Sequence, residues 1–423
     1  MKLTIPHIHK IEGEVGFWAE ITKKGKVEKL KIETLLGLRE IERILIGRRY
    51  FEAPIVVSRI CGVCPIPHSL AACCALEKAL GVKVSPLTVL LRKLLLSAGI
   101  IHSHTLHLFF LSLPDFFDIE NDLVLLKKFP KETKIALEIR NLALKICKVV
   151  GGRAVHPITP KIGGFSKIPQ KEKLKEILKE IPKIKEKTQI LIETFKKINY
   201  PSLKRKTIFV SLFSKKEYPF YESPKIKVKE KEMTIGDFYS VEIKEDLKSF
   251  PVKRVKFKGK PFMVGAVARL KNNLENLSPL AKENLKDFFK IIKKEEFFEN
   301  RYFNIFAQAI EILHFWEESE KLIKKILKTN LKEKLPKIKF KRSSGLGAIE
   351  APRGTLFHYY EINKEGRITF CNIITPSAQF LNNIEEDLKV LLKNIASLSL
   401  KEKEKKIKSL IRAYDPCISC ATH

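Results

Sequence analysis

The sequence predicts a mainly α-helical protein with smaller β appendages, an α+β fold. Apolar residues recur at helical spacing over several long stretches, and short alternating runs typical of strands are confined to a few regions. The 423 residues, 44% of them hydrophobic, provide ample material for a core. The chain contains neither an internal repeat nor a flexible linker, so we expect one domain over residues 1–423.

The first predicted element is a small sheet. Residues 3–35 alternate between apolar and polar side chains, and Lys23-Lys24-Gly25 has the composition of a hairpin turn. Residues 36–45 predict a short helix. Residues 68–80 predict a longer helix, which Gly81 would cap at its C-terminus.

The most apolar stretch covers residues 87–113 and predicts a long helix that ends before Pro114. It carries His102, His104 and His107 together with several serines, which a membrane-spanning helix rarely contains. We therefore expect a buried core helix. Its histidines are interpreted as buried, hydrogen-bonded packing residues rather than metal ligands.

The middle of the chain changes from helix to strand. Residues 131–150 and 171–198 predict two helices, the second interrupted near Pro182. Residues 206–270 then predict a small β-containing insertion. Its strand-like runs are residues 208–212, 226–228, 241–243 and 252–257.

The C-terminal part is predicted to be helical with one hairpin. Residues 363–366 have turn composition and separate two strand-like runs, residues 357–362 and 367–373. The predicted helices are residues 279–293, 302–328, 377–395 and 399–412.

Charge and cysteine content narrow the class of protein. The net charge is +32, but the lysines are spread along amphipathic stretches such as residues 171–197 and form no patch with interleaved aromatic residues. We interpret them as a solvated Lys/Glu-rich surface, which is typical of thermophiles, and expect no nucleic-acid partner. Eight cysteines are too few for a disulfide scaffold, and the N-terminus lacks the apolar core of a signal peptide. These features predict a soluble, cytoplasmic protein without a membrane span.

Four of the eight cysteines form two C-x-x-C pairs near opposite ends of the chain. Cys61 with Cys64, and Cys417 with Cys420, are much farther apart than the pairs of a zinc ribbon, which lie about 15–20 residues apart. On spacing alone a closed zinc site remains an alternative. The neighbouring residues argue against it, because a histidine follows each pair and the second pair lies at the end of the chain.

The motifs around these pairs, R-x-C-G-x-C-x-x-x-H and D-P-C-x-x-C-x-x-H, resemble the two signatures of the large subunit of nickel–iron hydrogenases. Further stretches resemble the same family in the same order: residues 11–13, 103–107, 113–115, 151–157, 265–269 and 350–356. The resemblance implies the large-subunit fold, built on a bundle of long helices. It also implies a catalytic subunit that cleaves or forms dihydrogen reversibly and heterolytically. The chain looks most like the soluble cytoplasmic group, which includes methyl-viologen-, deazaflavin- and NAD(P)-linked hydrogenases and sulfhydrogenase alpha subunits.

The resemblance implies a nickel–iron centre held by all four motif cysteines. Cys61, Cys64, Cys417 and Cys420 would bind nickel, and Cys64 and Cys420 would also bridge to iron. In the family this iron carries carbon monoxide and cyanide. Soft thiolates suit both metals, and one thiolate can bridge two of them.

Three residues are implied to act in catalysis. The terminal thiolate of Cys417 would accept the first proton, and Glu12 would relay protons between the metals and the surface. Arg353 would lie over the open metal position, where a guanidinium stays protonated. Asp415 would hold Arg353 or a neighbouring arginine, and Arg59 is the other candidate for that pairing.

Further residues are implied to support the centre. His68 would donate a hydrogen bond to a bridging sulfur, and Ser377 would bond an iron-bound cyanide. Glu42, the backbone carbonyl of Ile373 and the C-terminal His423 would hold a magnesium or similar ion, since hard oxygen ligands suit it. The role of that ion would be structural.

The chain has no evident way to pass electrons on. Cys73, Cys74, Cys147 and Cys371 lack the spacing of iron–sulfur ligands, and residues 345–350 lack the third glycine of a phosphate-binding loop. This gap and the resemblance imply a small subunit that carries iron–sulfur clusters, with further electron-transfer subunits. Two alternatives remain: a metal-free or zinc-bound relative with a structural, quinone-coupling role, and a basic, zinc-stapled nucleic-acid-binding protein.

Overall fold

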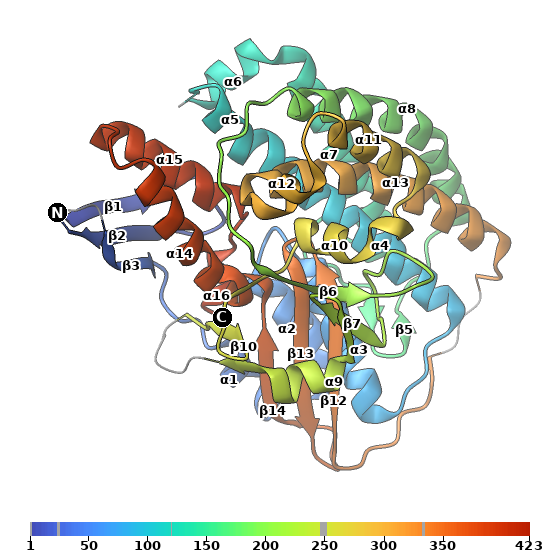
Figure 1. The fold of residues 1–423 in the computed structure, drawn as a ribbon. Coiled ribbons are helices and arrows are strands. Elements are labelled where there is room, and N and C mark those ends of the chain that lie inside the picture. Colours follow the sequence, from blue (N-terminus) through green and yellow to red (C-terminus); the bar gives the residue numbers. More distant parts are fainter. Residues whose placement is uncertain (1, 23–25, 120, 246–251, 332–334) are drawn as a thin grey trace.

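The computed structural model describes residues 2–22, 26–119, 121–245, 252–331 and 335–423. Long helices form one half of the molecule, and a three-stranded sheet with flanking helices forms the other (Figure 1). The N-terminus lies at the outer edge of a small separate sheet, whereas the C-terminus lies near the centre of the molecule.

Four long helices form a bundle: α4 (Pro86–Thr105), α7 (Pro130–Gly151), α8 (Lys171–Lys196) and α13 (Asn304–Lys328). Both α4 and α8 pack against α7 and α13. Buried side chains recur three or four residues apart, as an amphipathic helix requires. On α8 they are Leu174, Ile177, Ile181, Ile184, Thr188, Leu191, Ile192 and Phe195. The predicted bundle and the mainly α-helical class are confirmed.

The apolar core helix does not end before Pro114, so that predicted boundary is wrong. A π-helical turn (Leu106–Ser112) follows α4 and leads into α5 (Leu113–Phe116). Pro114 lies in the first turn of α5, where its missing N–H costs no helical hydrogen bond. This long stretch is apolar enough to cross a membrane, but 83% of its most apolar window is buried inside the protein. It therefore packs like the core helix of a soluble protein.

The predicted interruption of α8 near Pro182 is also wrong, because α8 runs through this residue. Pro182 lies on the exposed face of the helix. The hydrogen bond that proline cannot donate is therefore lost on the side that water reaches, where the cost is smallest.

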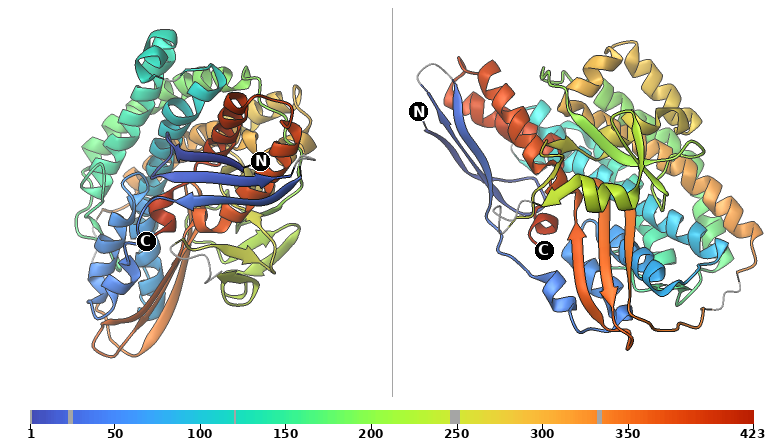
Figure 2. Two further views of the ribbon diagram at one scale, coloured as in Figure 1. Left: turned by 90° about the vertical axis from the view of Figure 1, so that its left-hand side faces the viewer. Right: turned by 60° about the horizontal axis from the view of Figure 1, so that its bottom comes forward.

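A three-stranded antiparallel sheet stands beside the bundle, formed by β12 (Ser343–Ala351), β13 (Gly354–Ile362) and β14 (Ile368–Ile374). The predicted hairpin joins β13 to β14. Helix α3 (Pro65–Leu80) packs against β12 and β13, and Figure 2 shows it behind the sheet. Gly81 ends α3 in the left-handed conformation, as predicted (φ 65°).

Close packing of α3 on β12 depends on two glycines. A Cβ atom on Gly345 would lie 2.0 Å from the carbonyl oxygen of Ala75, and one on Gly347 would lie 2.5 Å from that of Ala71. These glycines therefore belong to a strand that faces a helix, and residues 345–350 lie in β12 rather than in a phosphate-binding loop. The contact also positions the metal-site end of α3, which begins directly after Cys64.

Gly345→Ala is expected to lower the free energy of unfolding by about 1–3 kcal/mol, because the new methyl group meets helix backbone that cannot turn aside. Denaturant unfolding of the purified protein measures this effect. Gly37→Ala is the matched control, since a Cβ at Gly37 meets nothing within 4 Å. The two variants should differ clearly, and equal stability would contradict the close approach.

The predicted N-terminal sheet is present and antiparallel. It consists of β1 (Lys2–Ile8), β2 (Val15–Ile21) and β3 (Val27–Thr34), in that order. β3 lies against α14 (Pro376–Asn394), and Figure 2 shows the sheet in front of the C-terminal helices. The turn predicted at residues 23–25 lies outside the described residues.

The helix predicted over residues 36–45 is shorter, since α1 covers only Ile41–Leu45. The backbone N–H of Arg39 donates to the carbonyl of Thr422 (3.1 Å), and its guanidinium donates to the carbonyl of Ile60 (2.6 Å). These bonds to distant segments hold the residues before α1 outside the helix.

Several strands lie within residues 206–270, where strand-like runs were predicted. β6 (Ile208–Phe213), β7 (Lys225–Val228), β8 (Lys231–Thr234) and β11 (Phe262–Met263) form one sheet in the order β11-β6-β7-β8. β9 (Ile243–Glu245) pairs with β10 (Val255–Phe257).

The strand predicted at residues 241–243 is wrong in its first two residues, because a π-helical turn (Phe238–Glu242) precedes β9. The buried ring of Phe238 stacks on Phe257 and Phe357. This aromatic packing favours the compact turn over an extended chain.

The remaining elements are short or lie on the periphery. They are α2 (Ala53–Val57), α6 (Asp122–Lys128), β4 (Pro160–Lys161), β5 (Gly164–Phe165), α9 (Ile235–Asp237), α10 (Ala266–Asn273), α11 (Pro279–Phe289), α12 (Lys294–Glu299), α15 (Leu400–Ala413) and α16 (Ile418–Ala421).

Candidate metal centre

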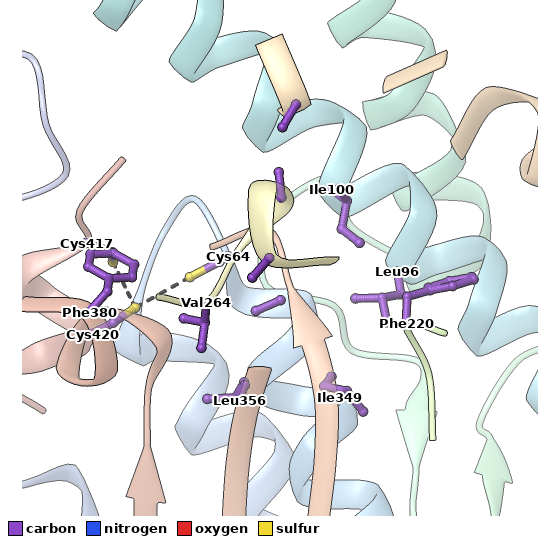
Figure 3. Packing of buried hydrophobic residues seen from close by; sticks show 14 of the residues in the cluster. Cys64, Leu96, Ile100, Phe220, Val264, Ile349, Leu356, Phe380, Cys417 and Cys420 are labelled. Atoms are coloured by element: carbon purple, nitrogen blue, oxygen red, sulfur yellow. Dashed lines mark hydrogen bonds between the residues drawn. The ribbon is translucent and has the colours of Figure 1, made fainter. Parts of the chain in front are cut away.

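The two cysteine pairs meet in the centre of the molecule. Cys61 follows a 3-10 turn, and Cys64 is the residue before α3. Cys417 is the residue before α16, and Cys420 lies in that helix. Figure 3 shows Cys64, Cys417 and Cys420 converging beside the ring of Phe380. Folding thus brings together two cysteine pairs that lie near opposite ends of the sequence.

The four sulfur atoms lie within 4.8 Å of one another, and all four side chains are buried. Cys64 and Cys420 are 3.5 Å apart, as are Cys61 and Cys417. Thiolates bound tetrahedrally at about 2.3 Å would lie about 3.8 Å apart, so four sulfur atoms this close can share one metal ion once Cys417 and Cys420, which are 2.8 Å apart, spread around it. Burial raises the pKa of Cys417 and Cys420, and a bound cation would supply the charge that keeps them as thiolates.

A small cavity, here called the side pocket, adjoins the sulfur atoms. It is lined by Cys64, His68, Ala351, Pro352, Arg353, Leu356, Pro376, Ser377, Cys417 and Cys420. The side pocket therefore adjoins both cysteines expected to bridge and also Cys417. The hydroxyl of Ser377 accepts the backbone N–H of Cys417 (2.9 Å), which leaves its hydrogen for a bond to another group.

Arg353 lies over the cysteines on the turn between β12 and β13. Its Nε donates to the carbonyl of Asp415 (2.7 Å) and its Nη2 to the carboxylate (2.8 Å). Burial opposes its charge, but Asp415 and the nearby thiolates raise the pKa of Arg353. Its Nη1 is buried without a hydrogen-bond partner among the described residues. A buried cation with a free donor at a thiol cluster fits an anionic or electron-rich group bound there.

Asp415 pairs with Arg353, the first of the two arginines considered for it. Its other carboxylate oxygen accepts from the amide of Gln308 (3.1 Å). Arg59 lies exposed on the turn before Cys61, and the structure does not bring it to Asp415.

Arg269 holds the turn that carries Arg353, a role that the sequence did not reveal. It donates to the carbonyls of Ala351 and Pro352 (both 2.9 Å). Its charge is balanced by the buried carboxylates of Glu311 and Glu350. The only signal in the sequence was its place in a stretch of family resemblance.

The predicted packing role of the helix histidines agrees with their surroundings. His104 bonds the carboxylate of Glu311 (2.8 Å), and His107 bonds Gln308. Nδ1 of His102 accepts from Nε of Arg140 (3.3 Å). None of the three belongs to the four-cysteine group.

His68 lies in the first turn of α3, in contact with Cys420. Its Nε2 is 3.5 Å from the sulfur of Cys420, and its Nδ1 is 3.2 Å from Nε2 of His358. Burial lowers the pKa of His68 to about 3, so the ring is neutral.

Glu12 contacts the other end of the cluster. Its carboxylate is 2.9 Å from the sulfur of Cys417 and accepts the hydroxyl (2.5 Å) and backbone N–H (3.1 Å) of Ser419. Gly13 allows this approach, because a Cβ there would lie 2.8 Å from the Cβ of Ile418 and the φ angle is +86°. Glu12 is only half-buried, so it spans the distance from the cluster towards solvent.

The predicted magnesium ligands also converge, but a lysine lies among them. Nε2 of His423 is 3.1 Å from the carbonyl oxygen of Ile373 and 3.6 Å from the carboxylate of Glu42. These separations are near those of adjacent ligands on an octahedral magnesium ion, about 3 Å. The ammonium of Lys253 donates to the same carboxylate (2.5 Å) and carbonyl (3.2 Å). Burial raises the pKa of Glu42, but His423 and Lys253 outweigh it and lower the pKa overall.

Comparison with known proteins identifies the family. The chain matches the sequence profile of the nickel-dependent hydrogenases over residues 39–135 and 210–423. The chain belongs to the nickel-dependent hydrogenase family. The four-cysteine cluster supports the nickel–iron centre of such enzymes. The protein is the catalytic large subunit of a nickel–iron hydrogenase, an oxidoreductase that oxidises or produces dihydrogen.

Individual relatives span the whole chain. The alpha subunit of sulfhydrogenase 1 from Pyrococcus furiosus is 30% identical, with 100% of this chain and 98% of the relative aligned. The corresponding subunit of the F420-non-reducing hydrogenase from Methanothermobacter marburgensis is 28% identical, with 100% and 95% aligned. Both relatives are parts of larger enzymes, so the large subunit described here also works with a partner.

Solved structures share the fold. An NAD+-reducing [NiFe]-hydrogenase in the H2-reduced state superimposes with a TM-score of 0.90 at 24% identity, covering 100% of this chain and 99% of the other. The Ni-Fe-Se hydrogenase of Desulfovibrio vulgaris Hildenborough gives a TM-score of 0.83 at 26% identity, with both chains covered completely. The predicted large-subunit fold is confirmed.

Proposed function

We propose that Cys61, Cys64, Cys417 and Cys420 hold nickel and that Cys64 and Cys420 also bridge to iron. The observation that carries this assignment is the group of four buried sulfur atoms within 4.8 Å. The side pocket is lined by both proposed bridging residues, Cys64 and Cys420, and we place the second metal on this side of the cluster. The bound centre would supply the heterolytic cleavage of dihydrogen.

We propose that the side pocket receives the carbon monoxide and cyanide ligands of the iron. Its wall combines apolar groups with two polar groups, the free Nη1 of Arg353 and the hydroxyl of Ser377. Cyanide is a hydrogen-bond acceptor, so both donors suit it, whereas apolar walls suit carbon monoxide. His68 donates to the sulfur of Cys420 and orients this bridging ligand.

Proton transfer begins, in our proposal, at the sulfur of Cys417. Its contact with Glu12 (2.9 Å) allows direct transfer to a carboxylate that reaches towards solvent. Arg353 remains positively charged. It stabilises negative charge at the centre and can donate a hydrogen bond from Nη1. Asp415 keeps it in place.

Arg353→Lys is expected to retain nickel and iron but to lower turnover by about 10- to 100-fold. The planar guanidinium of Arg353 can donate to Asp415 and to a group in the side pocket at the same time, whereas the flexible ammonium of lysine cannot. Dihydrogen uptake by the purified complex, normalised to its nickel content, measures the effect. Full turnover in this variant would contradict the role given to Arg353.

We further propose a structural magnesium or similar ion at Glu42, the carbonyl of Ile373 and His423. The spacing of these groups supports the ion, but the ammonium of Lys253 holds the same carboxylate and must move aside for it. The ion would fasten the last residue of the chain beside the cluster.

The partner is, in our proposal, a small hydrogenase subunit with iron–sulfur clusters, accompanied by further electron-transfer subunits. Outside the nickel–iron cysteines, the described part of the chain contains no other group of three or more metal-binding side chains. Electrons therefore need an acceptor beyond the described residues. Relatives named as NAD-reducing and F420-non-reducing hydrogenases support a cytoplasmic enzyme of the soluble group.

The basic surface is proposed to be solvated and of thermophilic type. Lysines of the bundle pair with glutamates, for example Lys145 with Glu180 and Lys324 with Glu320. Such pairs are spread along the helices and favour stability at high temperature over nucleic-acid binding. We also propose that residues 1–423 form one domain with the insertion at residues 206–270.

Metal analysis and infrared spectroscopy of the purified complex test the proposed function together. We expect one nickel and one iron per large subunit, infrared bands of metal-bound carbon monoxide and cyanide, and one magnesium. Zinc alone would favour the zinc-stapled alternative, and a metal-free protein would favour the quinone-coupling alternative. Nickel and iron without magnesium would show that Lys253, and not an ion, joins Glu42 and Ile373 beside His423.

A further inference from the structure

A line of buried hydrogen-bonding groups leads away from Cys420 behind His68. Nδ1 of His68 is 3.2 Å from Nε2 of His358, and Nδ1 of His358 is 2.9 Å from the hydroxyl of Tyr360. The three side chains are 1% exposed or less. We call His68, His358 and Tyr360 the imidazole string.

The fold positions the imidazole string from two elements. His358 and Tyr360 are two residues apart on β13, so they lie on one face of the strand. Helix α3 packs against β13 and brings His68 into line with them. The intervening Tyr359 points to the opposite face, where its hydroxyl donates to Glu361 (3.2 Å).

The contacts within the string restrict where its hydrogens lie. The 3.2 Å separation between Nδ1 of His68 and Nε2 of His358 is a hydrogen bond only when one of the two nitrogens carries a hydrogen and the other is bare. A neutral imidazole carries one N–H, so the hydrogen bond at one ring nitrogen decides which nitrogen bears it. The two N–H hydrogens and the hydroxyl hydrogen of Tyr360 can therefore be arranged in only two ways: all three point towards Cys420, or all three point away from it.

The charge on Cys420 selects between these two arrangements. A thiolate has no hydrogen, so it accepts only from an N–H on Nε2 of His68. Nδ1 of His68 must then accept from Nε2–H of His358, and Nδ1 of His358 must accept from the hydroxyl of Tyr360. In the opposite arrangement the bare Nε2 of His68 would face the negative sulfur. Hydrogen bonds aligned in one direction also polarise one another.

We propose that His358 and Tyr360 are positioning residues for the nickel–iron centre, because they fix the tautomer of His68 and strengthen its hydrogen bond to Cys420. This inference rests on the proposed function, in which Cys420 bridges nickel and iron. A donor to the sulfur withdraws electron density from it and so from the iron. Loss of that donor should raise electron density on the iron and lower the stretching frequency of bound carbon monoxide.

Infrared spectroscopy of the purified holoenzyme complex tests the proposal at equal nickel and iron content. His358→Leu should shift the carbon monoxide band to lower wavenumber, because Nδ1 of His68 loses its donor. His358→Gln should leave the band near its wild-type position, since an amide can donate to His68 and accept from Tyr360 at the same time. Turnover should follow the same order.

Tyr360→Phe tests whether the hydroxyl of Tyr360 donates to His358. It also replaces His358→Leu as the test if that variant does not assemble its metal centre. It should shift the band in the same direction but less, because only the polarisation is lost. Tyr359→Phe is the matched control and should not shift the band. Unchanged bands in His358→Leu or in Tyr360→Phe, or an equal shift in Tyr359→Phe, would overturn the proposal. A wild-type enzyme without such bands would instead overturn the proposed centre.

Discussion

Cys64→Ser is expected to abolish hydrogenase activity and to remove nickel and iron from the protein. Cys64 is buried, 3.5 Å from Cys420, at the side of the cluster that faces the side pocket. Serine is a harder and far less acidic ligand, so it cannot replace a thiolate that bridges two metals. Metal analysis and a dihydrogen uptake assay of the purified complex measure the two losses.

Cys73→Ser is the matched control for this loss. Cys73 lies in α3, the helix that begins directly after Cys64, and it is also buried, but it stands outside the four-cysteine group. A serine there can bond the helix carbonyl four residues earlier, so metal content and turnover should remain close to wild type. A Cys64→Ser enzyme with intact metals and full turnover would contradict the assignment of this cysteine as a bridging ligand.

Glu12→Gln is expected to keep the metals and their infrared bands while turnover falls by about 100-fold or more. Glutamine retains the size of the side chain and can still accept from Ser419. It cannot take a proton from Cys417, so the step that connects the cluster to solvent is lost. The variant should also lose most of the exchange between deuterium gas and water, which reports proton transfer without electron transfer to a partner.

Glu14→Gln makes the same change two residues away at an exposed position. It should leave both turnover and isotope exchange unchanged. Wild-type exchange rates in Glu12→Gln would exclude Glu12 as the proton relay and leave it with a structural role at Ser419.

Prediction from the sequence succeeded where a short motif carries the information. The cysteine pairs and their histidines could be recognised because metal ligands must have particular chemistry at fixed local spacing. The hairpin between β13 and β14 and the cap at Gly81 were also found, since both depend on local backbone conformation. Errors arose where packing in the folded protein overrode a local preference. Proline usually interrupts a helix, but α8 runs through Pro182, which lies on the exposed face of the helix.

The residues that support the centre were harder to find. None of these residues belongs to a recognisable sequence motif; they are Lys253, Gln308 and His358. Their partners are more than 60 positions away: Glu42 for Lys253, Asp415 for Gln308 and His68 for His358. Distances of this kind exist only after the chain has folded.

The helical class, the family and the four cysteines could be predicted from the order of residues, because hydrophobic periodicity and ligand spacing are local properties of the chain. Three features became visible only in the folded molecule: Asp415 holds Arg353 and not Arg59, Lys253 shares the carboxylate of Glu42, and an imidazole string stands behind Cys420. These features depend on burial and on hydrogen bonds between distant segments. A buried charge or ring nitrogen must find a partner wherever packing places one, and the order of residues does not record that place.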